Sequence, residues 1–256
     1  MWNNSEIEQR INKVVQWLKE KSIEANSVGL VCGISGGVDS AVVAALCKKA
    51  FPNNSLGVIM PCHSNPADKE DALLVGKISS IKIVEIDLGD AHTNILENIN
   101  EAIKGETVVS NAAVSQGNLK ARMRMATLYT LANINNYLVV GTDNAPESYT
   151  GYFTKYGDGG VDLLPISSLT KTEVREWARV LGMPEKIASR TPTAGLWQGQ
   201  TDESEMGITY EIIDRYLIGK EVPIEAQQRI EELHRVSEHK RNMPSTIELT
   251  QLERLD

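Results

Sequence analysis

Apolar and polar residues along the chain alternate in a way that predicts short strands separated by helices. Apolar runs with the length and β-branched content of buried strands span 28–34, 56–60, 81–86 and 137–140. Apolar residues that recur every three or four positions, as on one face of a helix, span 41–50, 68–79, 95–102 and 116–133. Strands that alternate with helices form parallel sheets. The pattern therefore predicts an α/β fold with a doubly wound parallel sheet and helices on both faces.

Two capped helices are predicted outside this region. Ser5 and Glu8 have the spacing of a capping box, in which two side chains bond the free backbone N–H groups of a helix start. Apolar residues follow at helical spacing and predict an N-terminal helix within 1–24: Ile7, Ile11, Val14, Val15 and Leu18. Thr170 and Glu173 repeat the capping-box spacing before a helix that Gly182 ends.

The last part of the chain is predicted to be helical. Patterns at 206–218 and 224–238 predict a C-terminal helical extension over 206–256. Segments rich in small and polar residues are expected to be loops: 104–115 and 143–160. Since no internal repeat or shift in composition divides the chain, residues 1–256 are expected to form a single domain.

The composition is that of a folded protein with an acidic balance. Of 256 residues, 41% are apolar and 23% are charged, and 34 Asp and Glu outnumber 26 Lys and Arg, which gives a formal net charge of −8. A chain of this length can bury enough apolar surface to fold. The negative charge disfavours nucleic acid as a partner.

Cysteine usage and the absence of long apolar runs predict a cytoplasmic protein. Cys32, Cys47 and Cys62 are odd in number and include no CxxC pair, which is typical of a reducing compartment. The longest apolar run, 41–47, is far shorter than the ~20 residues of a membrane helix. The first residues lack the apolar core of a signal peptide. No membrane association is expected.

The segment Ser35–Ser40, with the sequence SGGVDS, carries the sharpest chemical signal. It lies between a predicted strand and a predicted helix. Two glycines let the backbone approach an anion closely, and the first amides of the helix point at that anion. The lysine of a Walker loop is absent, and Asp39 is placed instead to bind Mg²⁺ beside bound phosphates. The sequence therefore predicts a phosphate-binding loop.

At this point the chain resembles the N-type ATP pyrophosphatases, whose fold is Rossmann-like and related to the adenine nucleotide alpha hydrolases. Further motifs make it similar to the ammonia-dependent NAD synthetases among them. In chain order these motifs are GNLKARMRM (117–125), GTDNAPE (141–147), YFTKYGDGGVDLLPI (152–166), SLTKTEV (168–174), PTAGLW (192–197), TDESEMGITYEIID (201–214) and EHKRNMP (238–244). The resemblance runs from about residue 28 to residue 244.

The resemblance implies a reaction in which the nicotinate carboxylate of deamido-NAD attacks the α-phosphate of ATP. Pyrophosphate leaves, and ammonia then displaces AMP from the adenylate to give NAD. ATP is the co-substrate, Mg²⁺ is the implied metal, and a homodimer is the implied assembly, with the N-terminal helix, Trp2 and Trp17 as candidates for its interface. Only residues 1–27 precede the first predicted strand, so no glutamine-hydrolysing domain is expected and free ammonia is the expected nitrogen source.

The matching motif positions assign roles to individual residues. The implied magnesium ligands are Asp39 and Glu147, and Asp158 is the implied catalytic residue that holds or deprotonates ammonium. ATP-binding positions are Gly33, Ile34, Ser35, Gly36, Gly37, Val38, Asp39, Ser40, Thr142, Lys171 and Thr193. Positions implied to bind deamido-NAD are Arg122, Lys155, Asp162, His239 and Lys240.

Plainer structural explanations stand beside several of these roles. Asp158 lies in a glycine-rich turn, which aspartate favours, and His239 lies in a basic cluster typical of an exposed helix end. Arg122 and Arg124 are two apart and would face different sides of a helix, and Arg122 is the chosen ligand. Pro146 is expected to hold Ala145 extended, which places the metal role of the next residue, Glu147, in question.

Two other functions compete with the synthetase. The first is an ATP pyrophosphatase that adenylates a tRNA base for thiolation, but such enzymes need catalytic cysteines and a basic RNA-binding surface, and this acidic chain lacks a CxxC pair. The second is a nonenzymatic nucleotide-binding module. Such a module would not need Glu147, Lys155, Asp158 and Lys171 together, and turnover of ATP would distinguish it from an enzyme.

Overall fold

A parallel four-stranded sheet forms the centre of the computed structural model, which describes residues 2–103, 112–193, 195 and 201–247. The strands lie in the order β3-β2-β1-β4 and all three pairings are parallel. Their bounds are β1 Gly29–Gly33, β2 Ser55–Ile59, β3 Lys82–Glu85 and β4 Tyr137–Val140. The four predicted strands are therefore confirmed to within a few residues. The chain order reverses between β1 and β4, which is where ligands bind in open α/β sheets.

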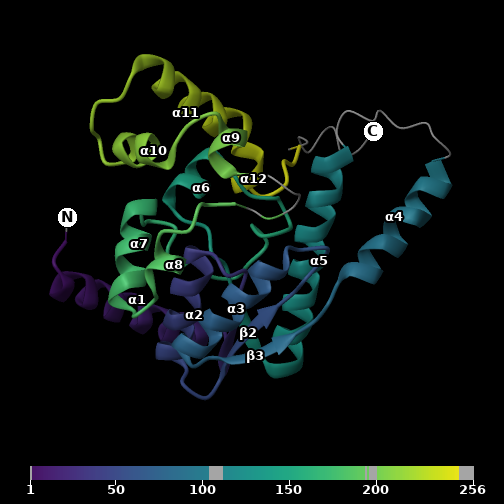
Figure 1. Cartoon of the computed structure of the whole chain (residues 1–256), viewed down its shortest axis with the longest axis horizontal. Helices are drawn as coiled ribbons and strands as arrows, with labels where there is room; N and C mark the ends of the chain where they lie inside the picture. The colour runs from purple at the N-terminus through teal and green to yellow at the C-terminus, as the bar shows by residue number, and fades with distance from the viewer. Residues whose placement is uncertain (1, 104–111, 194, 196–200, 248–256) are drawn as a thin grey trace, which may run out of the picture.

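Helices cover both faces of the sheet (Figure 1). On one face lie α1 (Asn4–Glu24), α2 (Val38–Ala50), α3 (Pro66–Ser79), α7 (Lys171–Val180) and α8 (Glu185–Ala188). On the other lies α5 (Ala112–Asn135), which contacts β1 and β4. Along β1 the side chains alternate: Leu30 and Cys32 pack in the apolar cluster that includes α2, and Val31 packs with Leu128 of α5. The predicted doubly wound, Rossmann-like sheet is confirmed.

The N-terminal helix begins two residues earlier than its predicted capping box. The Asn3 side chain accepts a hydrogen bond from the backbone N–H of Glu6, whose carboxylate accepts from the N–H of Asn3. The predicted pair of Ser5 and Glu8 is therefore wrong. The apolar face of α1 packs against α2 and α7, and its buried residues are Ile7, Ile11, Val15, Leu18 and Ser22. The apolar face of α1 is therefore covered by the same chain.

Helices replace parts of both predicted loops. Residues 112–115 belong to α5, and 104–111 lie outside the described residues. Within 143–160, α6 spans Ala145–Thr150 and has a capping box made by Asn144 and Glu147. Pro146 lies in the first turn of α6, where a helix does not need the backbone N–H that proline lacks. Ala145 is therefore helical, and the expectation of an extended Ala145 is wrong.

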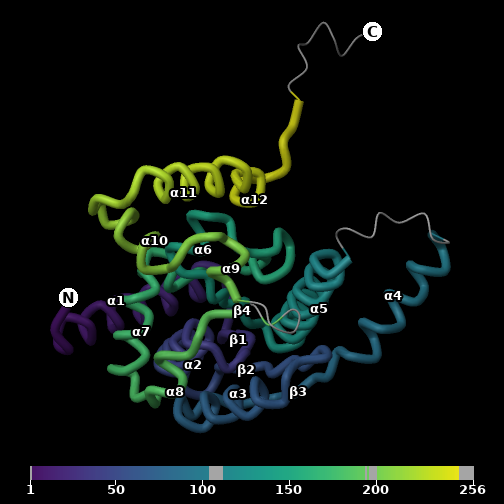
Figure 2. Tube along the Cα trace, turned by 45° about the horizontal axis from the view of Figure 1, so that its top comes forward, coloured from purple at the N-terminus to yellow at the C-terminus, as the bar shows by residue number. Residues whose placement is uncertain are grey.

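The helical extension lies over the carboxyl ends of the strands, next to α6 (Figure 2). It consists of α9 (Asp202–Met206), α10 (Tyr210–Leu217), α11 (Ile224–Val236) and α12 (Glu238–Arg241). The helix predicted at 206–218 is confirmed as α10, but it begins later, at Tyr210, because Gly207 ends α9 in the left-handed region with φ 69°. Helix α10 contacts both α6 and α7, so the extension borders the edge of the sheet where ligands are expected.

Helix α4 (Gly89–Ile103) points away from the body in both views (Figures 1 and 2). Its only buried residues are Gly89 and His92, near its first turn. Among the described helices none has a stretch long and apolar enough to cross a membrane.

Candidate active site

The predicted phosphate-binding loop joins β1 to α2 at the reversal point of the sheet. Gly36 has φ 82°, and a Cβ there would lie 2.8 Å from the backbone oxygen of Asp68, so glycine is required for both conformation and space. The Ser35 hydroxyl accepts from the N–H of Gly37 at 3.2 Å, and the Ser40 hydroxyl accepts from the N–H of Ser35 at 3.2 Å. Two serines of the motif thus hold the loop in its curved conformation.

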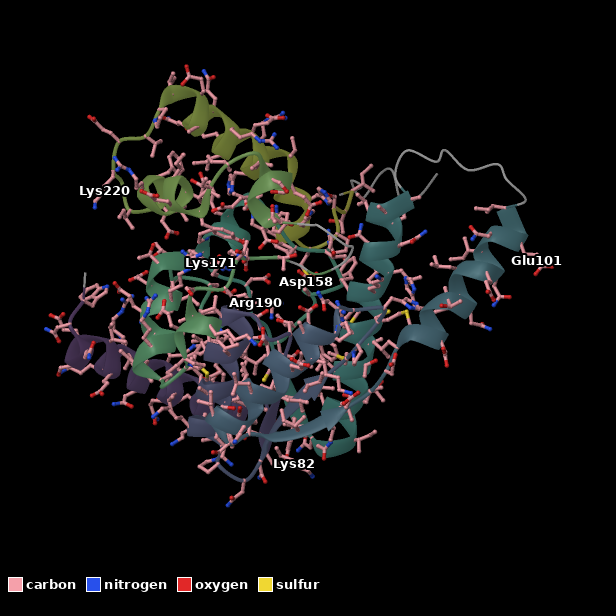
Figure 3. The ribbon with its side chains drawn as sticks, in the orientation of Figure 1. Lys82, Glu101, Asp158, Lys171, Arg190 and Lys220 are labelled. Carbon is pink, nitrogen blue, oxygen red and sulfur yellow. The ribbon has the colours of Figure 1, made fainter. Side chains whose placement is uncertain are left out.

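A large cavity opens above this loop, with a volume of about 630 Å³. All the predicted loop residues from Gly33 to Ser40 line it except Gly36, as do Thr142, Thr193 and Lys171. Figure 3 shows Lys171, Asp158 and Arg190, which all line this cavity, between the sheet and the helical extension. The structure therefore brings the predicted ATP-binding positions together in one site.

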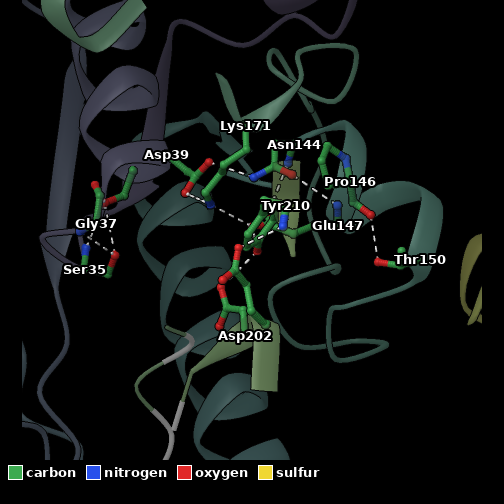
Figure 4. Close-up of polar contacts among 12 residues, drawn as sticks. Ser35, Gly37, Asp39, Asn144, Pro146, Glu147, Thr150, Lys171, Asp202 and Tyr210 are labelled. Atoms are coloured by element: carbon green, nitrogen blue, oxygen red, sulfur yellow. Dashed lines mark hydrogen bonds and ion pairs between the residues drawn. The ribbon is translucent and has the colours of Figure 1, made fainter. Parts of the chain in front are cut away.

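Lys171 links the two predicted magnesium ligands. Its ammonium nitrogen lies 2.8 Å from Oδ2 of Asp39 and 3.1 Å from Oε1 of Glu147, and its side chain is only 2% exposed (Figure 4). The Asn144 side chain donates to Oδ1 of Asp39 at 2.9 Å and also caps α6, the helix that carries Glu147. Asp39, Asn144 and Lys171 come from distant parts of the chain. The tertiary fold alone makes this cluster.

The electrostatics of the cluster favour a cation. Burial raises the pKa of Glu147 to about 7, although Lys171 opposes the rise. Burial also raises the pKa of Asp143 well above its usual range, and the neighbouring carboxylates of Asp158, Glu147 and Asp39 raise it further. Burial alone would lower the pKa of Lys171, but Asp39 and Glu147 raise it above the usual value. The carboxyl groups of Asp39, Glu147 and Asp143 thus all interact with the Lys171 ammonium.

These residues fit Mg²⁺ together with phosphate oxygens. Mg²⁺ in phosphoryl-transfer sites binds to one or two carboxylates and to the substrate phosphates, and Asp39 and Glu147 line the cavity beside the phosphate-binding loop. Within the described ranges, no three His, Cys, Asp or Glu side chains form a ready-made metal centre. Asp39 and Glu147 would therefore supply only part of the coordination of Mg²⁺, and the phosphate oxygens of a bound nucleotide would supply more.

Asp158 and Lys240 also line the cavity. The Asp158 carboxylate accepts from the N–H of Thr154 at 3.0 Å, within the glycine-rich turn. The Lys240 ammonium donates to the backbone oxygens of Gly151 and Phe153, both at 2.8 Å. Both predicted residues therefore reach the cavity, with Lys240 tied to the segment that precedes Asp158.

The other predicted deamido-NAD ligands lie outside the cavity lining. Lys155 donates to the backbone oxygen of His239, and Arg122 donates to the backbone oxygen of Lys155 at 3.4 Å, so these three gather on one exposed surface. Asp162 accepts from the hydroxyl of Tyr129 at 2.9 Å and from the N–H of Val139 at 2.8 Å. In this chain Asp162 therefore supports β4.

Several residues of the site have no counterpart in the sequence-based prediction. Arg124 lines the cavity, whereas Arg122 does not, because the two face different sides of α5. Arg190 donates to the backbone oxygen of Gly36 at 3.2 Å and to the carboxylate of Asp71 at 3.0 Å, so it holds the phosphate-binding loop against α3. The further residues are Asp143, Asn144, Asp202 and Tyr210. Asp143 and Asn144 lie inside the motif at 141–147, and Tyr210 inside that at 201–214, so the motifs contained the only signal for them.

Comparison with known proteins decides the family. A family model described as NAD synthase matches residues 10–244. Two relatives, from Alkaliphilus metalliredigens and Alkaliphilus oremlandii, are named NH(3)-dependent NAD(+) synthetase. They are 55% and 53% identical to the chain over 93% of its length, and the matches cover 98% and 96% of their own. The chain belongs to the NAD synthase family.

Solved structures agree with membership of the NAD synthase family. An NMN synthetase from Francisella tularensis superposes with a TM-score of 0.88 at 39% identity and covers 95% of this chain and 99% of its own. An NH3-dependent NAD synthetase from Campylobacter jejuni superposes with a TM-score of 0.75 at 30% identity, covering 94% and 99%. NAD synthases are ligases that form a carbon–nitrogen bond, so the predicted enzyme class is confirmed and the two competing functions are set aside.

Proposed function

We propose that this NAD synthase amidates deamido-NAD with free ammonia through an adenylated carboxylate and releases AMP and pyrophosphate. One observation carries the proposal: at the end of the phosphate-binding loop the Lys171 ammonium lies within 3.1 Å of the carboxylates of both Asp39 and Glu147. Attack on the α-phosphate requires the triphosphate to be held and its negative charge to be balanced. A buried ammonium group and two carboxylates for a cation supply that balance.

Each group has a defined task in the proposed reaction. The N–H groups at the start of α2 bind phosphate oxygens, and the Lys171 ammonium donates to the triphosphate. Asp39 and Glu147 would hold Mg²⁺, which supplies further charge neutralisation on the departing pyrophosphate. Asp158 would accept a proton from ammonium near the carbonyl carbon, which frees the nitrogen lone pair for attack. Thr142 and Thr193 offer hydroxyls to ATP from the cavity wall.

The first experiment measures the products directly. The purified protein is incubated with ATP, Mg²⁺, deamido-NAD and ammonium chloride, and NAD, AMP and pyrophosphate are quantified. We expect the three products in equal amounts, and Asp39→Ala and Glu147→Ala are expected to lower the rate about 100-fold. Formation of ADP, or unchanged ATP, would contradict the adenylation mechanism.

The nitrogen source is tested in a parallel tube with glutamine in place of ammonium. We expect no NAD there, because the motifs at 28–244 resemble those of ammonia-dependent synthetases, and release of ammonia from glutamine requires a separate hydrolase activity. With ammonium, the rate is expected to rise from pH 7 to pH 9, since the reactive species is NH₃. A rate that stays flat or falls while the protein remains folded would argue against free ammonia as the nucleophile.

A mononucleotide is the second candidate for the carboxylate substrate. It is favoured by the fold likeness to the Francisella tularensis protein, which is named an NMN synthetase and superposes more closely than the Campylobacter jejuni NAD synthetase. The curated relatives above 50% identity are named NAD(+) synthetases, so the dinucleotide remains the first candidate. To decide between them, kcat/KM is measured for nicotinate mononucleotide and for deamido-NAD under the same conditions. The substrate with the higher kcat/KM is the preferred one.

A homodimer is part of the proposal, with α4 in its interface. Ile95 and Ile99 are four residues apart and so share one face of α4, where they are 37% and 45% exposed. Exposed apolar helix faces are typical of protein–protein contacts. A second copy of the chain packed on this face would cover them.

A further inference from the structure

One face of α10 reaches the charged groups of the nucleotide site from the helical extension. Tyr210 and Asp214 are four residues apart on α10, hence on the same face, and they are 1% and 6% exposed. Both are polar side chains on a helix that contacts α6 and α7, and Tyr210 packs in an apolar cluster with Ile213 and Tyr149. Buried polar groups of this kind are retained where their hydrogen bonds hold something in place.

Tyr210 contacts three charged side chains at once. Its hydroxyl lies 2.8 Å from Oε1 of Glu147 and 3.0 Å from Oδ2 of Asp202, so its single proton bridges two carboxylates (Figure 4). The Lys171 ammonium lies 4.5 Å from the centre of the Tyr210 ring, on the face that attracts cations. One ring therefore fixes the carboxylate of Glu147 from one side and the ammonium of Lys171 from another.

Asp214 holds the first turn of the helix that carries Lys171. Its two carboxylate oxygens accept from the N–H groups of Lys171 and Thr172, both at 2.9 Å, and Oδ2 also accepts from the Thr172 hydroxyl at 2.7 Å. The Thr170 hydroxyl accepts from the N–H of Glu173. The first N–H groups of α7 are thus paired, and a negative charge lies at the positive end of its dipole.

We propose that Tyr210 and Asp214 are positioning residues, which set Glu147 and Lys171, respectively, for binding of the ATP triphosphate. The proposal rests on the proposed function in taking ATP as the ligand, Glu147 as a ligand of Mg²⁺ and Lys171 as a phosphate ligand. Helix α10 is then a working part of the nucleotide site, although it lies outside the sheet and contributes none of the predicted ATP ligands. Tyr210 acts through a carboxylate that binds the metal, and Asp214 acts through an ammonium group that binds phosphate directly.

These two routes predict different responses to magnesium. Binding of ATP is measured by calorimetry in Mg²⁺ and again in EDTA, for Tyr210→Phe, for Asp214→Asn and for the control Glu211→Gln. Tyr210→Phe keeps the ring but removes the hydroxyl, so we expect about 10-fold weaker binding in Mg²⁺ and no change in EDTA. Asp214→Asn is expected to weaken binding about 10-fold under both conditions, because Lys171 contacts phosphate with or without the metal.

Glu211→Gln is the matched control, since it removes one negative charge from the exposed side of the same helix. We expect its ATP affinity to equal that of the wild type in both conditions. If Tyr210→Phe and Asp214→Asn bind ATP as this control does, the proposal is wrong. A loss for Tyr210→Phe that is equal in Mg²⁺ and in EDTA would also overturn its assignment to Glu147.

A double-mutant cycle separates positioning from general stability. In a Glu147→Ala background Tyr210 has no Glu147 to position, so adding Tyr210→Phe is expected to change the Mg²⁺-dependent affinity by less than about twofold. Full additivity would contradict the proposal. Should Asp214→Asn fail to fold, Thr172→Val removes one of its three donors and is expected to weaken ATP binding about threefold.

The outcome for the wild type distinguishes the two levels of proposal. If the wild type binds ATP but forms no NAD, the proposed reaction fails, and the variants still decide the role of α10. If it forms NAD and the variants bind ATP normally, only the role of α10 fails. If the wild type does not bind ATP, both fail.

Discussion

Two neighbouring glycines of the phosphate-binding loop differ in what a side chain would meet. At Gly36 a Cβ would lie 2.8 Å from the backbone oxygen of Asp68 and the backbone has φ 82°, whereas at Gly37 φ is −80° and the nearest atom is the Ser35 hydroxyl at 3.3 Å. We expect Gly36→Ala to lower the free energy of unfolding by about 2 kcal/mol or more. Gly37→Ala should lower it by less than about 1 kcal/mol. Denaturant unfolding measures both, and equal losses would contradict the assigned strain.

The raised pKa of Glu147 makes stability depend on pH in a defined direction. Burial raises this pKa from 4.5 to about 7, so between these values the folded protein holds a proton that the unfolded chain releases. Stability contributed by this group is therefore lost as pH rises toward 7. We expect the unfolding free energy of the wild type to fall relative to Glu147→Gln by up to about 3 kcal/mol between pH 4.5 and 7.5. Parallel curves for the two proteins would refute this sign.

At the scale of elements, the short helix α6 depends on its cap more than on its proline. Asn144 is fully buried, caps α6 and donates to Asp39, whereas Pro146 only shapes the first turn. Asn144→Ala is expected to cost about 2 kcal/mol of stability and to weaken ATP binding several-fold, since Asp39 and Glu147 both lose a partner. Pro146→Ala should cost only about 0.5–1 kcal/mol, through the entropy of the unfolded chain, and leave ATP affinity unchanged. Unfolding curves and calorimetry of this pair test the contrast.

At the scale of the whole molecule, α4 leaves an apolar face without a partner among the described residues. We expect sedimentation of the wild type to give twice the chain mass, and Ile95→Lys with Ile99→Lys to give the mass of one chain. Buried lysines without partners are too costly for an interface to retain. Ile224→Lys is the control, because Ile224 is 59% exposed at the start of α11, which lies away from α4 (Figure 1). An unchanged mass for the α4 variant would place the interface elsewhere.

The local parts of this enzyme follow from the sequence alone. The four strands, the helices between them and the Ser35–Ser40 loop depend on residues close in the chain, whose periodicity and glycines determine backbone conformation directly. The family motifs also pointed to Asp39, Glu147 and Lys171, which the structure places together, and their roles stay predictions. The sequence did not determine which residue caps α1. Asn3 and Ser5 are each followed three residues later by a glutamate, so both fit the spacing of a capping box.

Only the tertiary structure decided which side chains meet. Asp39 and Lys171 are 132 positions apart, and Asp39 and Asn144 are 105 apart, so no local pattern relates them. Arg124, not Arg122, lines the cavity because of how α5 is rotated against β1 and β4. The sequence shows that the two arginines face different sides of the helix, but it does not show which side faces the cavity. From the sequence alone, Tyr210 and Asp214 are only two residues that share one face of a helix. Their hydrogen bonds to Glu147 and to the start of α7 exist only because the extension folds back over the carboxyl ends of the strands, where buried polar groups must find partners across the chain.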